Sequence, residues 1–135
     1  MNKPFIDTNL IIRLLTGEPE KQAVAARSFF ESVDRGEITP YLATIVVAEV
    51  VFVLKSFYEF EKTAIIDALL NLITSPAIAV QDREIVLSAL TIFRDKNIHF
   101  VDCYAAAYSQ ITQAPVASFD SDFDKIEAVK RLPLL

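Results

Sequence analysis

The sequence predicts a single α/β domain, residues 1–135, with a mostly parallel sheet of four to five strands. Short apolar segments of strand type alternate with segments of helical spacing, and this alternation is typical of α/β domains. The length of 135 residues also suits one domain. Two helices in a row between neighbouring strands indicate crossovers on both faces of the sheet.

Four short apolar segments resemble strands that are buried on both faces of a sheet. They are residues 3–6, 38–43, 77–80 and 116–119, and residues 132–135 are expected to add a weak edge strand.

Six segments between these strands are predicted to be helical. They are residues 9–15, 19–35, 44–57, 62–73, 83–96 and 102–110. Gly17 and Gly36, the only glycines, stand where the first two helices should end, because glycine accepts the left-handed conformation of a helix C-terminus. Pro19 suits the first turn of the second helix.

Two of the helices show a repeating apolar face. In the second, Ala25, Phe29 and Val33 recur at four-residue spacing and are expected to face the core. In the fifth, the apolar side consists of Ile85, Val86, Ala89, Leu90 and Phe93.

The net charge of −5 argues against a protein that holds nucleic acid by charge alone. It argues less against an enzyme whose acidic cluster is neutralised by a divalent metal ion. The single cysteine, Cys103, cannot form an intramolecular disulfide, which suits the cytoplasm. No targeting segment is visible, and Pro40 and Glu49 interrupt the longest apolar run, so we expect no membrane span.

Four acidic residues follow strands or lie near the starts of helices. Asp7 follows the first strand and Asp120 the fourth, so both should project from the carboxyl edge of the sheet. Asp102 begins the last helix, and Glu49 lies one and a half turns into the helix after the second strand. The sequence therefore predicts that these four carboxylates converge at one edge.

Glu49 is the only charged residue between Glu37 and Lys55, and its neighbours are apolar. We therefore expect it to be at least partly buried. A buried carboxylate needs a cation, a hydrogen bond or a proton, and a shared metal ion would supply the cation.

Each of the four residues also has a purely structural interpretation. Asp7 and Asp102 stand where helix N-caps stand, and Asp120 could be a turn residue. Glu49 could pair with a distant arginine such as Arg13 or Arg94.

Four motifs resemble those of PIN-domain ribonucleases, in particular the VapC-type toxins of bacterial toxin–antitoxin pairs. They are FIDTNLIIRLL at 5–15, VAEV at 47–50, DCYAAA at 102–107 and SFDSDF at 118–123. They occur in the family's order and cover nearly the whole chain. The resemblance implies a three-layer α/β/α sandwich with strand order 3-2-1-4-5, Mg²⁺ or Mn²⁺ at the acidic cluster, and a homodimer.

The chemistry that we expect at this cluster is hydrolysis of a phosphodiester. Asp7, Asp102 and Asp120 would hold the metal, and Glu49 would ligate it, directly or through water, or orient the nucleophile. Other polar residues would assist: Thr8, Asn9, Ser118 and Asp122 would support the ligands, and Arg13 and Lys55 would contact the RNA backbone.

Several alternatives stay open at this point. Asp122 and Asp124 compete with Asp120 for the fourth acidic position, although Asp120 directly follows the strand. His99 is expected to be structural or on the surface. A small antitoxin protein is the expected partner of a toxin, but a housekeeping PIN nuclease or a non-catalytic RNA- or protein-binding scaffold would share the fold. A phosphotransferase with Asp7 as nucleophile is disfavoured, because Asn9 stands where a second aspartate is usual.

Overall fold

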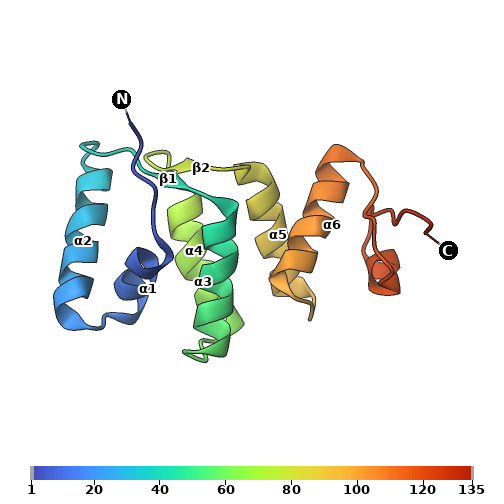
Figure 1. Ribbon diagram of the computed structural model, residues 1–135, viewed down its shortest axis with the longest axis horizontal. Coiled ribbons are helices and arrows are strands. Elements are labelled where there is room, and N and C mark those ends of the chain that lie inside the picture. Colours follow the sequence, from blue (N-terminus) through green and yellow to red (C-terminus); the bar gives the residue numbers. More distant parts are fainter. Residues whose placement is uncertain (1, 135) are drawn as a thin grey trace. The chain divides into compact units, whose positions relative to one another are not determined.

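The computed structural model describes residues 2–134 and divides into two compact units, Met1–Asp82 and Arg83–Leu135. Helices with a small parallel sheet make up the fold, as the α/β prediction requires (Figure 1). The single domain of residues 1–135 stays a prediction. No helix within residues 2–134 combines the length and the apolar character that crossing a membrane requires.

The first unit contains four helices that pack in sequence around its core. They are α1 (Thr8–Thr16), α2 (Glu20–Asp34), α3 (Thr44–Ser56) and α4 (Lys62–Ile73). Helix α1 packs on both α2 and α3, and α3 packs on α4 (Figure 1). The bounds of α4 are those that the sequence predicts, α1 is one residue longer at each end than predicted, and α3 ends one residue earlier than predicted. Gly17 ends α1 in the left-handed conformation.

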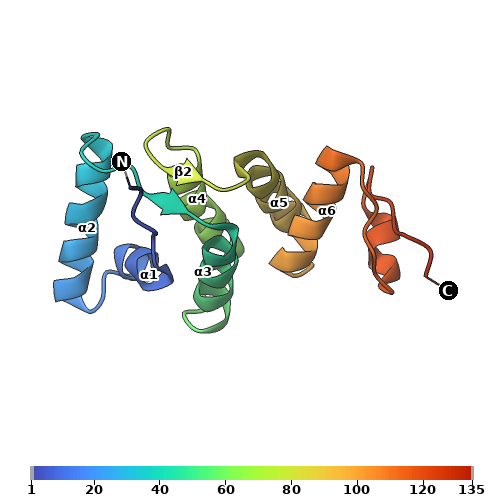
Figure 2. The same cartoon turned by 45° about the horizontal axis from the view of Figure 1, so that its top comes forward.

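Three parallel segments form the sheet of the first unit. Strand β1 (Tyr41–Leu42) lies beside β2 (Ala79–Val80) and pairs with it (Figure 2). On its other side, β1 pairs with Phe5. The second predicted strand therefore lies between the first and the third. The number of strands and their full order stay predictions.

These strands are shorter than the sequence predicts. The segments at 38–43 and 77–80 contribute two residues each, and the segment at 3–6 contributes a single bridge at Phe5. Pro4 and Pro40 explain part of the difference, because proline has no N–H to donate to a ladder. Both contribute only their carbonyls, which accept hydrogen bonds from Tyr41 N and Ala79 N, each at 2.8 Å.

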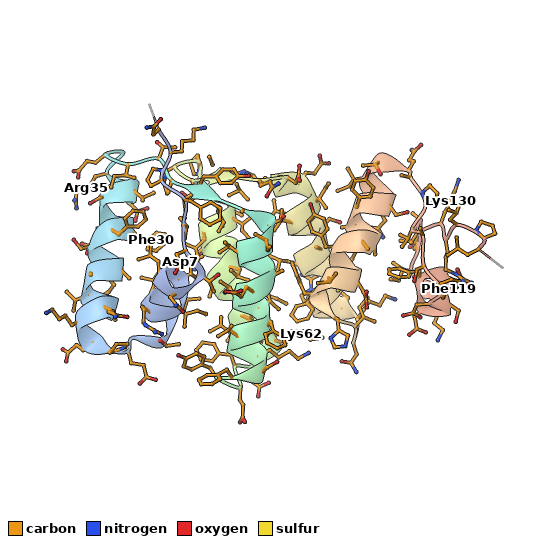
Figure 3. All side chains as sticks on the ribbon, viewed as in Figure 1. Asp7, Phe30, Arg35, Lys62, Phe119 and Lys130 are labelled. Carbon is orange, nitrogen blue, oxygen red and sulfur yellow. The ribbon has the colours of Figure 1, made fainter. Side chains whose placement is uncertain are left out.

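The buried face of α2 differs from the predicted one. Ala25 is exposed and Phe29 only half-buried, whereas the buried positions are Ala23, Ala26, Phe30 and Val33. Figure 3 shows Phe30 on the side of α2 that faces α1. The four-residue spacing alone could not settle the face, because several apolar residues of this helix fit a stripe shifted by one position.

The second unit contains α5 (Arg83–Asp95), α6 (Phe100–Thr112) and the short 3-10 helix η1 (Ser121–Lys125). Helices α5 and α6 pack on each other, and the rings of Phe93 and Phe100 meet edge to face with centroids 5.9 Å apart. Helix α6 begins two residues before Asp102, with His99 at its N-cap position. The prediction that Asp102 opens this helix is therefore wrong, and so is its interpretation as an N-cap.

The fourth predicted strand, residues 116–119, is reduced to one bridge between Val116 and Arg131. Val116 N donates to Lys130 O at 2.7 Å, and Leu132 N donates to Val116 O at 2.8 Å. The chain then turns, because the Ser118 hydroxyl accepts a hydrogen bond from Asp120 N at 2.9 Å. The predicted edge strand at 132–135 does not form among its described residues 132–134, because the bridge lies one residue earlier, at Arg131. Residue 135 lies outside the described residues.

The burial pattern predicts that substitution of two isoleucines has very different effects on the free energy of unfolding. Ile65 in α4 is 0% exposed, whereas Ile45 in α3 is 73% exposed. Ile65→Ala should lower the free energy of unfolding by about 2–5 kcal/mol, because it removes buried methyl groups and leaves a cavity. Ile45→Ala should stay within about 0.5 kcal/mol of the wild type. Urea denaturation of both variants measures this, and equal losses would contradict the packing of α4.

Candidate functional site

Asp7 lies where the N-terminal segment turns into α1 (Figure 3). It is the N-cap of this helix, and its Oδ2 accepts a hydrogen bond from Asn9 N at 3.2 Å. Thr8 is buried, so the turn at Asp7 is anchored in the core while the Asp7 carboxylate stays exposed. Asp7 therefore has the N-cap role that the sequence allowed, and the backbone N–H of Asn9 is its hydrogen-bond partner.

Asp7 shares a pocket of about 290 Å³ with Arg13. Asn9, Leu10, Gln22 and Ala25 complete the walls of this pocket. The Arg13 Nε donates to the Gln22 Oε1 at 2.8 Å, which ties the guanidinium on α1 to the side chain of α2. This bond orients Arg13 beside Asp7, and sequence reasoning missed Gln22.

Glu49 is exposed, so the prediction of a buried carboxylate is wrong. Helix α3 buries one side, formed by Val46, Val47, Val50, Val51 and Leu54. Glu49 lies on the opposite side, between the exposed Ile45 and Phe52. Because α3 is apolar on both sides, a charged residue among apolar neighbours did not indicate burial. Lys55 lies in the last turn of the same helix.

The second unit brings Asp102 and Asp120 into one cavity of about 160 Å³. Asp102 reaches it from the first turn of α6, and Asp120 from the residue before η1. Asp122 and His99 line the same cavity, together with Asn97, Ile98, Phe123 and Ile126. Since bulk water takes about 30 Å³ per molecule, this volume suits a hydrated ion or one phosphate group rather than a large ligand.

The three aspartates around η1 have different partners. Asp122 pairs with Lys125 at 3.2 Å, and Asp124 is held by Arg131 through two hydrogen bonds of 3.1 and 2.9 Å. The hydrogen bonds from the Arg131 guanidinium hold the pKa of Asp124 below its usual value. Among the described residues, Asp120 is the one aspartate of the three outside such an ion pair.

Asp120 also has a structural role, because it is the N-cap of η1. Its Oδ1 accepts a hydrogen bond from Asp122 N at 2.8 Å, and Ser118 Oγ accepts one from Asp120 N. Ser118 and Asp122 thus support Asp120, because they form a tight turn that fixes its backbone and one of its carboxylate oxygens.

His99 was expected to be structural or on the surface, and it is both exposed and on the cavity wall. Its position three residues before Asp102 carried the missing signal, because residues three apart at the start of a helix lie on one face.

The four predicted ligands are divided between the units, Asp7 and Glu49 on the first and Asp102 and Asp120 on the second. Within neither unit do the described residues contain a group of three or more His, Cys, Asp or Glu side chains that could hold a metal ion. The convergence of all four therefore stays a prediction. The oxygen donors of the cavity nevertheless match the chemistry that Mg²⁺ and Mn²⁺ prefer.

Comparison with known proteins gives one significant match. The sequence matches the PIN domain family over residues 5–129, a range that includes all four acidic residues and runs through both units. No curated protein and no solved structure gives a significant match. The chain therefore belongs to the PIN domain family, whose members are generally nucleases that use divalent metal ions.

Proposed function

We propose that this protein is an endoribonuclease that hydrolyses RNA phosphodiester bonds with Mg²⁺ or Mn²⁺, and that it is the toxin of a toxin–antitoxin pair. The family match over residues 5–129 carries this proposal. The shared cavity of Asp102 and Asp120 supports it from the geometry, because two oxygen-donor side chains from separate elements meet there.

The proposed metal ligands are Asp7, Asp102 and Asp120, with Glu49 acting directly or through a water molecule. A bound divalent ion supplies Lewis-acid chemistry, since it acidifies water and stabilises the negative charge that develops on the phosphate. Asp102 and Asp120 lie in the second unit and line one cavity there. Asp7 has free capacity for a ligand role, because its carboxylate is exposed and only one of its oxygens accepts the cap hydrogen bond from Asn9.

Arg13 is the proposed contact to the RNA backbone near Asp7. Its hydrogen bond to Gln22 uses Nε, which restricts the guanidinium and leaves the two terminal nitrogens to donate to a phosphate. Guanidinium groups bind phosphate oxygens through such paired N–H groups. Lys55 remains a second proposed contact.

Asp7→Asn and Asp102→Asn should each lower RNA cleavage by more than about 100-fold. Loss of residues that only support a metal ligand costs about 10–100-fold, so loss of a ligand should exceed that range. Asparagine caps a helix about as well as aspartate, so Asp7→Asn should keep the wild-type circular dichroism spectrum and melting temperature. Asp67→Asn, which changes an exposed aspartate of α4, is the matched control. Full activity of either test variant in saturating Mn²⁺ would remove that residue from the metal site.

Asp120 can be tested for both of its roles by comparing two substitutions. Asp120→Asn keeps an oxygen for the hydrogen bond from Asp122 N, whereas Asp120→Ala loses it. In EDTA, Asp120→Asn should melt at or above the wild-type temperature, because it removes a charge from the acidic cluster, and Asp120→Ala should lose about 0.5–2 kcal/mol. Mn²⁺ should raise the melting temperature of the wild type more than that of either variant, since ligand binding to the folded state stabilises it. An unchanged response to Mn²⁺ in Asp120→Asn would leave Asp120 with the cap role alone.

Expression of the protein alone should arrest bacterial growth, and co-expression of a small protein encoded beside it should restore growth. The net charge of −5 favours a more basic partner, because complementary charges speed association. The catalytic variant Asp102→Asn should leave growth unaffected. If the wild-type protein cleaves RNA in vitro but causes no growth arrest, the protein is a housekeeping nuclease. RNA binding in EDTA without cleavage in Mn²⁺ would instead identify a scaffold.

A further inference from the structure

Beside the carboxylate cavity, the second unit has another pocket of about 360 Å³ that the proposed metal site does not use. It is lined by Phe119, Asp124, Arg131, Pro133 and Leu134. Pockets for small ligands begin at about 300 Å³, so this one can hold a single planar group. Phe119 directly precedes Asp120, so this pocket and the carboxylate cavity are lined by neighbouring residues of the chain.

Phe119 gives this pocket an exposed aromatic wall. Its side chain is 73% exposed, although the sequence predicts a buried strand there. Figure 3 shows it beside η1. Among residues 2–134, the contacts between aromatic rings do not include Phe119, and most of its surface is accessible to a ligand.

Arg131 gives the pocket a fixed guanidinium rather than a free cation. Its Nε and Nη2 both donate to the Asp124 carboxylate, and its Nη1 donates to Ser118 O at 3.5 Å. The edge that would bind a phosphate in bidentate fashion is therefore occupied, and the charge of Arg131 is compensated by Asp124. The side chain is still 29% exposed, so the pair offers a planar surface with little net charge.

These features select a neutral, planar ligand over an anionic one. Nucleobases stack on aromatic rings and on guanidinium planes, and single-stranded RNA can turn such a base outward. We propose that the Phe119 pocket binds one unstacked nucleobase of a single-stranded RNA, next to the phosphodiester that is cleaved. This inference rests on the proposed function for its substrate.

The first experiment measures RNA affinity in EDTA by fluorescence anisotropy, which does not depend on cleavage. Phe119→Ala should weaken binding of a short single-stranded RNA by roughly 5- to 150-fold, the effect of removing one stacking partner of a base. Phe119→Trp keeps an aromatic face and should bind like the wild type. Phe57→Ala is the matched control, because Phe57 is 78% exposed and lies in the first unit.

The second experiment removes the base instead of the ring. A set of RNAs carrying one abasic nucleotide at successive positions is tested on the wild type and on Phe119→Ala. One position should weaken wild-type binding about as much as Phe119→Ala does, and the variant should lose nothing further there, because coupled partners are not additive. The loss at one abasic position is measured on the wild type alone, and if Phe119→Ala fails to fold, Phe119→Leu, which removes the ring but keeps an apolar side chain, is used to measure the coupling.

The outcomes separate the pocket from the nuclease. If the wild type cleaves RNA but no abasic position couples to Phe119, the nucleobase pocket is wrong and the proposed function stands. If binding couples to Phe119 but no RNA is cleaved in Mg²⁺ or Mn²⁺, the proposed function is wrong and the pocket stands. If Phe119→Ala changes only the oligomeric state in sedimentation, the pocket is a contact between copies of the chain, which overturns the nucleobase proposal.

Discussion

Strand β1 is the constraint on which the first unit depends. Tyr41 pairs with Phe5 on one side and with Ala79 on the other, so the segment before Asp7 and β2 are held in parallel register on either side of β1. The side chain of Gln81, just after β2, accepts hydrogen bonds from Thr44 N at 3.0 Å and from Thr44 Oγ1 at 3.3 Å. Helix α3 lacks a side-chain cap of its own, so this contact supplies one. The carboxyl ends of three parallel segments thus determine where α1 and α3 begin.

The structural and chemical interpretations of the aspartates are compatible. Asp7 and Asp120 are both N-caps, and each uses one oxygen to accept a backbone N–H. An ionised carboxylate offers about four lone-pair directions, so a capping oxygen leaves capacity for a metal ion. A cap also restricts the rotamer of the side chain, which is useful in a ligand. Asp102 does not have this double role, because His99 and not Asp102 occupies the N-cap position of α6.

The helices and the buried face of α5, with Val86, Ala89, Leu90 and Phe93, could be predicted from the sequence, whereas the strands and the buried face of α2 could not. Gly17 and the apolar spacing of α4 mark local boundaries, and these depend on only a few neighbouring residues. The length of a strand depends on its partners in the sheet. Pro4, in the segment beside β1, has no N–H to donate and so limits the hydrogen bonds between the two. The predicted burial of Glu49 was wrong for a related reason, because tertiary packing decides which side of an apolar helix is covered.

For the site, the sequence located the four acidic residues but not the groups that hold them in place. The hydrogen bond from Arg13 to Gln22 joins two helices, and no local motif marks it. His99 could be found only once the start of α6 was known, because a shift of two residues changes which side chains share a face with Asp102. Which side chains share a face of a helix is therefore harder to predict than where the helix begins.

An acidic protein that acts on RNA must obtain affinity from something other than a basic surface. Here the arginines and lysines seen in ion pairs have carboxylate partners on the same surface, as in Arg35–Glu37, Arg94–Asp95 and Arg131–Asp124. Arg13 differs, because its side-chain partner Gln22 is neutral and leaves the charge of Arg13 in place beside Asp7. A net charge of −5 disfavours non-specific binding to the phosphate backbone, which depends on basic residues. On the proposed function, recognition then rests on the metal ion, one oriented guanidinium and contacts to uncharged bases, and the open ring of Phe119 is suited to the last of these.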